Sequence, residues 1–215
     1  MAPGIPWVPD TASLAARMAT RVHLVRHGEV HNPDHLVYAS LPGFGLSPTG
    51  EEQARAVARY LGRQPVVGIW SSPLERALRT AEAIANRTGL AVKIEEDLAE
   101  WKLMDRWAGV PWEALPEKFP GELEAFLDHP VDLPFSPESL EQLASRMAAA
   151  VRALDRAHPH GDVVAVSHSA PVRAGALALT GEPLDRFWEV EPGHCTVTTL
   201  RPNKRWEIEA VWTPE

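Results

Sequence analysis

The chain has 215 residues, of which 45% are hydrophobic and 23% are charged, as is typical of one globular domain, and no apolar run approaches the roughly 18 residues of a membrane span. Its formal net charge of -8 argues against a nucleic-acid surface, which normally carries a basic footprint. The single cysteine, Cys195, excludes an internal disulfide, and no secretory signal is visible, so we expect a cytoplasmic protein with no membrane or nucleic-acid partner.

Residues 1–20 are predicted to form an N-terminal arm, because prolines and glycines crowd its start and only a short helical stretch, residues 11–19, follows. From residue 21 onward, strands and helices alternate. We predict strands at residues 22–26, 66–70, 91–94, 163–167, 195–200 and 206–212, and helices at residues 48–61, 73–88, 137–157 and 171–179. Ser47 is the expected N-cap of the first helix, and Gly89 and Gly181 are expected to end the second and the fourth.

This alternation predicts an α/β fold, a single-domain three-layer sandwich over residues 21–215 with helices flanking a mainly parallel sheet. The last two strands differ, because only the four residues 202–205 separate them. So short a connection joins antiparallel strands and not parallel ones, and we therefore predict a hairpin at one edge of the sheet.

Residues 101–134 interrupt the alternation and are rich in tryptophan, proline, glutamate and phenylalanine, with one short helix expected at residues 113–126. Long excursions of this kind are often functional lids. We predict an insert or lid over one end of the sheet that sets specificity together with the loop of residues 32–45. The side chains expected to give this lid an apolar surface are Trp101, Trp107, Trp112 and Phe119.

Two histidines directly follow apolar strands: His27 in the sequence RHGE, residues 26–29, and His168 in SHS, residues 167–169. Open α/β sheets bind ligands at the carboxyl ends of their strands, and these two ends are expected to share one edge. A single histidine in such a turn is usually an ordinary turn residue. Two at one edge, with the guanidinium of Arg26 beside the first, predict a site for a phosphate-like anion.

The stretch SSPLERALRTA, residues 71–81, follows the second strand and opens a helix. Ser71 or Ser72 can cap this helix, whose free amides favour an anion. Arg76 lies about one turn into the helix and Arg79 lies further along. Helix arginines are ordinarily solvated or paired with nearby glutamates, but the position at the strand end favours Arg76 as a site residue.

A cluster of carboxylates after the third strand is the source of a candidate general acid: Glu95, Glu96, Asp97 and Glu100. Most of such a run is solvated, and the spacing does not choose among the four. The ring of Trp101 can exclude water from Glu100 and raise its pKa toward a general-acid value. The remaining histidines and the lone cysteine lack metal-ligand spacing, so we expect no metal site.

Four motifs together resemble the histidine phosphatase superfamily, also called the phosphoglycerate mutase-like family. They are RHGE (26–29), LSPTGEEQA (46–54), SSPLERA (71–77) and VSHS (166–169), in family order and with family-like separations. The resemblance covers residues 20–200 and implies a phosphoglycerate mutase-like α/β domain. Residues 187–197 resemble the ribazole-phosphatase-like branch, and His194 there is expected at the pocket mouth or in a loop role.

The resemblance implies a role for each motif residue. His27 would attack phosphorus and become a phosphohistidine, while Arg26, Arg76 and His168 would hold the phosphoryl oxygens. Glu100 would protonate the leaving oxygen and then help to activate water.

Two positions depart from the family pattern. Ser169 replaces a glycine that often follows the second histidine, and we expect it to cap the next helix or contact phosphate. Asn32, one residue short in spacing, corresponds to the family's asparagine and is expected to bind phosphate. Glu29 is expected to hold the turn or its arginines.

The leading prediction is a metal-independent phosphomonoesterase that hydrolyses a small phosphorylated metabolite through a phosphohistidine, with no cofactor. One alternative is phosphoglycerate mutase-type transfer, which needs a basic site for a second acidic group. The insert offers few cations, only Lys102, Arg106 and Lys118. Another alternative is a non-catalytic protein that binds a phospho-ligand. The sequence makes no prediction of oligomeric state.

Overall fold

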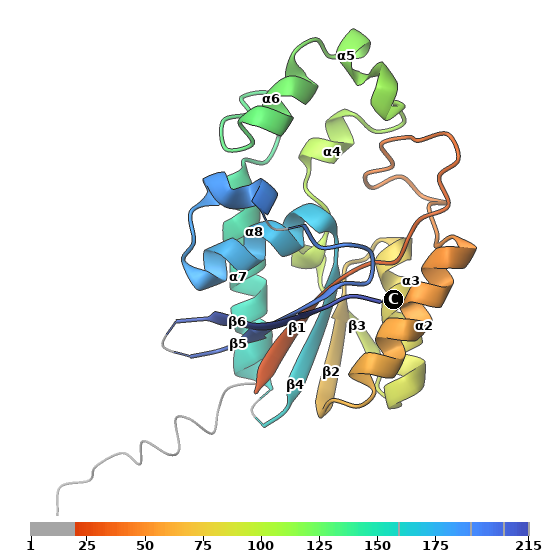
Figure 1. Ribbon diagram of the computed structural model, residues 1–215, viewed down its shortest axis with the longest axis vertical. Coiled ribbons are helices and arrows are strands. Elements are labelled where there is room, and N and C mark those ends of the chain that lie inside the picture. The colour runs from red at the N-terminus through yellow and green to blue at the C-terminus, as the bar shows by residue number, and fades with distance from the viewer. Residues whose placement is uncertain (1–19, 159, 190, 204, 215) are drawn as a thin grey trace, which may run out of the picture.

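A computed structural model describes residues 20–158, 160–189, 191–203 and 205–214. The predicted arm therefore lies outside the described residues except for Thr20. Within the described part, one six-stranded sheet runs through the molecule, and the segment of residues 101–134 stands beyond one end of it (Figure 1).

The sheet contains β1 (Arg21–Arg26), β2 (Val66–Ser71), β3 (Val92–Ile94), β4 (Asp162–Ser167), β5 (Val197–Arg201) and β6 (Glu207–Trp212), in the order β3-β2-β4-β1-β5-β6. Strands β1 to β4 are parallel to one another, whereas β5 is antiparallel to β1 and to β6. The predicted mainly parallel sheet with an antiparallel hairpin at its edge is confirmed. Strands β1 and β4 lie side by side at its centre.

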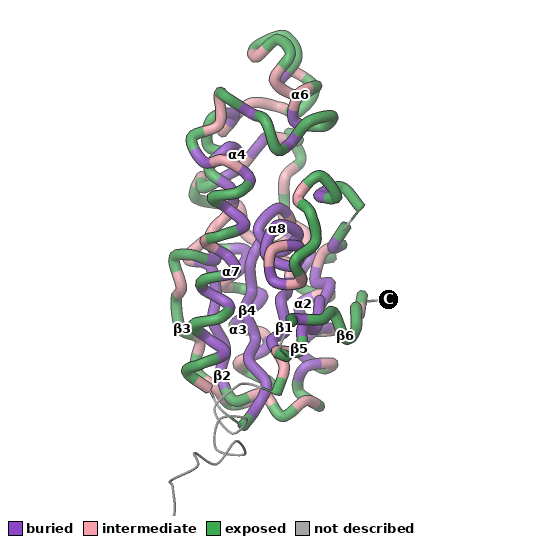
Figure 2. Tube along the Cα trace, turned by 90° about the vertical axis from the view of Figure 1, so that its left-hand side faces the viewer, coloured by how far each residue is buried: buried purple, intermediate pink, exposed green. Residues whose placement is uncertain are grey.

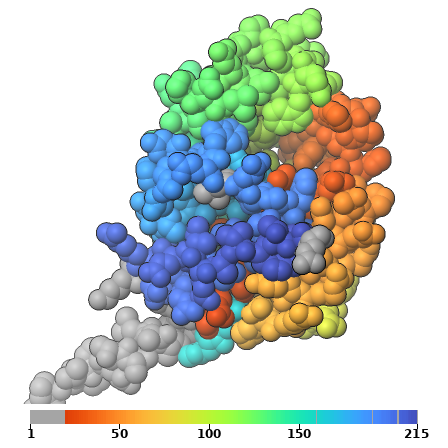
Figure 3. All heavy atoms as spheres, viewed as in Figure 1, coloured from red at the N-terminus to blue at the C-terminus, as the bar shows by residue number. Residues whose placement is uncertain are grey.

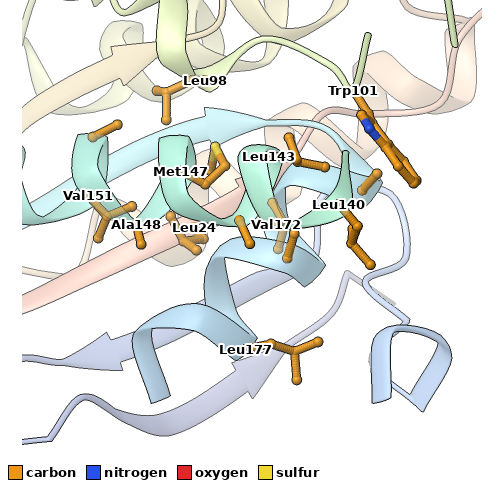
Figure 4. Packing of buried hydrophobic residues seen from close by; sticks show 14 of the residues in the cluster. Leu24, Leu98, Trp101, Leu140, Leu143, Met147, Ala148, Val151, Val172 and Leu177 are labelled. Carbon is orange, nitrogen blue, oxygen red and sulfur yellow. The ribbon is translucent and has the colours of Figure 1, made fainter. Parts of the chain in front are cut away.

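Helices cover both faces of the sheet and make the three layers that the sequence predicts. Side chains alternate along each strand, so Leu24 of β1 packs with residues of α7 (Leu140–Ala157) and α8 (Ser169–Thr180). Val25 packs with residues of α2 (Pro48–Leu61) and α3 (Glu75–Thr88) on the other face. Figure 4 shows the first of these cores in detail, and Figure 2 shows the buried strands between exposed outer surfaces.

Several predicted helix ends are confirmed, and three starts are wrong. Ser47 caps α2, and Gly89 and Gly181 end α3 and α8 in the left-handed conformation. Helix α7 begins three residues later than predicted, because Ser139 forms a capping box with the third helical residue. Helix α3 begins at Glu75 with Leu74 as its N-cap, so neither Ser71 nor Ser72 caps it.

Helix α8 begins two residues earlier than predicted. His168, directly after β4, has an extended conformation and is itself the N-cap residue, so the helix starts at Ser169. Pro171 therefore lies in the first turn, where a proline costs no hydrogen bond. The strand predicted from Cys195 begins instead at Val197, because Cys195 has a φ of 55° that a strand cannot contain.

The insert is a chain of short elements and not the single helix predicted over residues 113–126. It contains α4 (Leu103–Arg106), η2 (Trp112–Ala114), α5 (Leu115–Lys118) and α6 (Glu122–Asp128). Gly121, with a φ of 80°, breaks the predicted helix. Figure 3 shows the insert as the green end of the molecule, next to the orange surface of the loop before α2.

The turn after β1 is fixed by a close approach of two glycine backbones. A Cβ atom on Gly28 would lie 2.7 Å from the carbonyl oxygen of Gly50, and one on Gly50 would lie 2.0 Å from that of Glu29. The Ser47 hydroxyl also donates to Glu29 Oε1 at 2.6 Å, and the Glu29 amide donates to Gln53 Oε1 at 2.8 Å. Glu29 therefore holds the turn that carries His27 against the start of α2.

Replacing Gly50 with alanine is predicted to destabilise the protein by roughly 1 to 3 kcal/mol, because backbone atoms block the added methyl group. The melting temperature should fall, and the turn that carries His27 should shift. Thr49→Ala, at an exposed helical position beside it, is the control and should leave the melting temperature nearly unchanged. Equal melting temperatures for both variants would contradict the close approach.

Candidate active site

The two strand-end histidines meet at the carboxyl edge of the sheet. Arg26, the last residue of β1, is in register with Ser167, the last residue of β4, so the residues that follow are neighbours. The rings of His27 and His168 lie with their centroids 5.1 Å apart, and both side chains are buried. The predicted convergence of these two residues is what the geometry shows.

The ring of His27 is held in one orientation. Its Nδ1 lies 2.7 Å from the carbonyl oxygen of Gly28, which can only accept, so the proton resides on Nδ1. Its Nε2 then has a free lone pair, which accepts a hydrogen bond from Arg76 Nε at 3.2 Å. A fixed imidazole with an unprotonated Nε2 is the arrangement that a nucleophile needs.

Two guanidinium groups lie near His27, the buried one of Arg76 and the partly buried one of Arg26. Arg76 donates from Nη2 to the carbonyl oxygen of Ala39 at 2.9 Å and lies over the Tyr38 ring at 4.6 Å. Arg26 donates to the Pro192 carbonyl oxygen at 2.9 Å and to His194 Nε2 at 3.0 Å. Its Nε is buried and has no hydrogen-bond partner among the described residues.

Among the described residues, no carboxylate lies within ion-pair distance of either guanidinium. The partners of Arg26 and Arg76 are neutral carbonyls, imidazoles and an aromatic face. Both positive charges are therefore left for an anion placed next to His27.

His168 is oriented by a serine from the neighbouring strand end. Its Nε2 lies 2.7 Å from Ser72 Oγ, and that hydroxyl also accepts from the Leu74 amide at 3.3 Å. In the tautomer whose Nε2 accepts the Ser72 hydroxyl proton, the imidazole proton lies on Nδ1. This Nδ1 is buried, has no hydrogen-bond partner in the described structure, and lies 4.0 Å from Glu100 Oε2.

Glu100 is the member of the acidic cluster that reaches the site. It borders the same cavity as Arg26, whereas Glu96 and Asp97 are exposed and the Glu95 side chain accepts from the Asp97 amide. The Glu100 carboxylate accepts from the Trp101 amide at 2.9 Å.

The backbone before Glu100 is clamped by Arg146 of α7. This guanidinium donates to the carbonyl oxygens of Asp97 and Ala99 at 2.7 and 3.1 Å. It also donates to both carboxylate oxygens of Glu138, at 2.8 and 3.0 Å. Arg146 therefore fixes the backbone that leads to Glu100, the candidate acid.

Burial and the two arginines shape the protonation of the site. Burial and the charge of Arg76 hold the pKa values of His27 and His168 well below the ordinary value of 6.5. Burial raises the pKa of Glu100, against the opposing effect of Arg76. Burial, then Arg26, lowers the pKa of His194 to about 4. At neutral pH this combination favours a neutral nucleophile beside a carboxyl group that keeps its proton longer than usual.

The other predicted residues are placed differently from one another. Ser169 borders the cavity at the first position of α8 and is not its cap. The Asn32 side chain bonds both the amide and the carbonyl group of Leu36, so it braces the loop. Arg79 is an exposed residue whose Nε lies 3.8 Å from Glu75 Oε1, as is ordinary for a helix arginine. His194 contacts Arg26, and its ring lies 5.9 Å from that of His27.

A cavity of about 340 Å³ opens beside this group. It is walled by the loop before α2, the insert, α8 and η3 (Leu184–Glu189). Its lining residues are Arg26, Leu36, Val37, Tyr38, Ala39, Glu100, Met104, Trp112, Phe126, Leu127, Ser169, Ala170, Arg173, Phe187 and Trp188.

Of the four aromatic residues expected to form the lid surface, only Trp112 lines this cavity. Trp101 and Trp107 are buried in the core, and Phe119 packs against it. Arg173 is not among the residues predicted from the sequence. It lies four residues after Ser169 on the same helix, a spacing that places both side chains on one face and could have indicated Arg173 as a cavity residue.

The described residues contain no group of three or more histidine, cysteine, aspartate or glutamate side chains placed to hold a metal ion. Nor does any helix in the described ranges have the length and apolarity to cross a membrane.

Comparison with known proteins gives consistent matches. The family model of the histidine phosphatase superfamily (branch 1) matches residues 22–212. An uncharacterized protein of Mycobacterium tuberculosis is 42% identical over 179 residues, which are 79% of this chain and 81% of that protein. Phosphoserine phosphatase 1 of Hydrogenobacter thermophilus is 31% identical over 188 residues, 86% of this chain and 88% of that protein. A mycobacterial glucosyl-3-phosphoglycerate phosphatase solved with VO3 superposes with a TM-score of 0.80 at 28% identity, covering 92% of this chain and all of that one.

Histidine NMR tests the protonation of the site. The C–H signals of His27 and His168, assigned with His27→Gln and His168→Gln, should show no titration near pH 6.5, where a histidine in an unfolded chain titrates. Below about pH 6.5 these two histidines bind protons in the unfolded chain but not in the folded site. Their contribution therefore lowers the free energy of unfolding as the pH falls. Glu100, with its raised pKa, acts in the opposite sense. Midpoints near 6.5 for both histidines would contradict their burial beside the arginines.

Proposed function

Because the chain belongs to branch 1 of the histidine phosphatase superfamily and is a phosphatase, we propose that it hydrolyses small phosphomonoesters without a metal, through a phosphohistidine on His27. The observation that carries this proposal is the unprotonated Nε2 of His27 beside the buried guanidinium of Arg76 and the partly buried one of Arg26, neither of which has a carboxylate within ion-pair distance among the described residues. Phosphoryl transfer needs an in-line nucleophile and compensation of spread negative charge, and this set of side chains supplies both.

In the first step, the lone pair of His27 Nε2 forms a bond to phosphorus while the bond from phosphorus to the ester oxygen breaks. Arg26, Arg76 and the Nδ1–H of His168 donate to the phosphoryl oxygens. Glu100 gives its proton to the leaving oxygen, which departs as an alcohol. Its raised pKa keeps that proton available at higher pH than an exposed carboxyl group would.

In the second step, the Glu100 carboxylate takes a proton from a water molecule as the water oxygen bonds to phosphorus. The bond between His27 Nε2 and phosphorus breaks, and phosphate leaves. Glu100 and His27 thereby return to their starting protonation states. Ser169 borders the cavity and His194 contacts Arg26, and both are proposed to contact the phosphoryl group or its arginines, with Asn32 acting through the loop.

The substrate is proposed to be a small phosphorylated metabolite. The named relatives act on such compounds, phosphoserine for one and glucosyl-3-phosphoglycerate for another. The cavity of about 340 Å³ with aromatic walls has room for a small organic group beyond the phosphate. A cytoplasmic location and the lack of a nucleic-acid partner stay predictions of the sequence.

His27→Ala is predicted to lower kcat for p-nitrophenyl phosphate more than about 1,000-fold in metal-free buffer, because the nucleophile is lost. Rapid quenching of the wild type with alkali should trap a labelled phosphoenzyme that is absent from the variant. His129→Ala, at an exposed position, is the matched control and should keep its activity. Transfer of phosphate between phosphoglycerate hydroxyls in place of its release would favour a mutase, and ligand binding with no turnover would favour a binding protein.

Glu100→Gln is predicted to lower kcat by about 100- to 10,000-fold for an alkyl phosphate such as glycerol phosphate, since an alkoxide leaves poorly without a proton. The loss should be much smaller for p-nitrophenyl phosphate in single-turnover phosphorylation of the enzyme. Glu96→Gln, in the exposed part of the acidic cluster, should resemble the wild type. Equal losses for both esters would contradict proton donation by Glu100.

A further inference from the structure

One buried cation in the cavity wall has no part in the steps above. Arg173 lies on α8, and its side chain is 8% exposed. The guanidinium carbon lies 4.9 Å from the ring centroid of Trp188 and 5.4 Å from that of Phe187. Its Nε is buried and makes no hydrogen bond within the described part of the chain.

The charge of Arg173 is poorly compensated by the protein itself. Among the described residues, the carboxylate within ion-pair distance is that of Glu191, 3.8 Å from Nη2. Glu191 is 82% exposed, so water screens this pair and it contributes little. A buried guanidinium with so weak a counter-ion is suited to an anion that arrives with a ligand.

The position of Arg173 relates it to the substrate. It borders the same cavity as Arg26, Glu100 and Ser169. Arg26 is committed to the phosphoryl group in the proposed reaction, which leaves Arg173 to face the remainder of the substrate. Apart from these two arginines, no lysine or arginine lines this cavity in the described structure.

We propose that Arg173 binds a carboxylate of the substrate, so that the enzyme selects phosphomonoesters that carry a carboxylate a few bonds from the ester. This inference rests on the proposed function. The planar guanidinium fork matches a carboxylate with two parallel N–H···O bonds. The rings of Phe187 and Trp188 hold the plane of the guanidinium and exclude water, which strengthens the contact. One cation suits a carboxylate monoanion better than a second phosphate dianion.

Glu191 then competes with the substrate for the same guanidinium. A bound carboxylate takes its place, and the exposed Glu191 side chain turns to solvent. Glu191→Gln should therefore lower KM for carboxylated substrates several-fold and leave KM for their neutral analogues nearly unchanged.

Matched substrates test the proposal. 3-Phosphoglycerate and glycerol 3-phosphate differ by a carboxylate in place of a hydroxymethyl group, and phosphoserine and phosphoethanolamine differ by the presence of a carboxylate. The wild type should favour the carboxylated member of each pair, and Arg173→Gln should reduce that kcat/KM ratio by about tenfold or more, as expected for loss of a charge-assisted hydrogen bond. Arg79→Gln removes a surface arginine as the control and should keep the wild-type ratio.

The outcomes separate this inference from the proposed function. Suppose that the wild type hydrolyses p-nitrophenyl phosphate but has a kcat/KM ratio near one for carboxylated over neutral substrates, or that Arg173→Gln leaves this ratio unchanged. Either result overturns the carboxylate role alone. The carboxylate role is also overturned if the wild type prefers glucose 1,6-bisphosphate over glucose 6-phosphate by a larger factor than it prefers either carboxylated substrate over its neutral analogue. If circular dichroism shows that Arg173→Gln does not fold, the same kcat/KM ratio measured for the wild type and for Arg173→Lys decides whether the carboxylate role holds. No hydrolysis of any ester by the wild type contradicts the proposed function and this inference together.

Discussion

The site depends on positive charge that the fold holds away from water without an ion-pair partner among the described residues. Arg76 is buried and Arg26 is partly buried, and their direct contacts are carbonyl oxygens, imidazoles and the Tyr38 ring, with the Glu100 carboxyl group further away. This arrangement costs folding free energy, and it attracts an anion even though the whole chain carries a net charge of -8. Burial, and after it the charges of Arg76 and Arg26, lowers the pKa of His27, so that its ring stays unprotonated. The same two arginines therefore contribute both to anion affinity and to an available nucleophile.

Much of this arrangement follows from local sequence. The apolar runs of β1 and β4 predict buried parallel strands, and parallel strands end at a common edge, so His27 and His168 were expected to meet there. Helix α2 was predicted at its observed bounds because Ser47, Pro48 and the following pattern mark its start. These signals lie within a few residues of what they determine, and for that reason they can be read without the tertiary structure.

Features that depend on contacts between distant segments were not predictable in the same way. The apolar content of the insert indicated a lid surface, yet Trp101 and Trp107 are buried in the hydrophobic core that also contains Leu24 of β1 and residues of α7 and α8. Arg173 looks like any helix arginine until α8 is placed against η3 and the cavity. The choice of Glu100 from its acidic cluster likewise needed Arg146, which reaches it from α7 and clamps the preceding backbone.

The cavity wall and the phosphoryl pocket are supplied largely by different parts of the chain. His27, His168 and the flanking arginines stand on the ends of central strands and on α3, whereas most of the wall comes from the loop before α2, the insert, α8 and η3. Substitutions in η3 and in the insert residues of the wall leave the contacts of Tyr38 and Ala39 with Arg76 in place, so they can accumulate without moving the reacting atoms. A lineage that carries this fold is able to exchange one phosphorylated compound for another through a few mutations in its periphery, with the catalytic chemistry inherited intact.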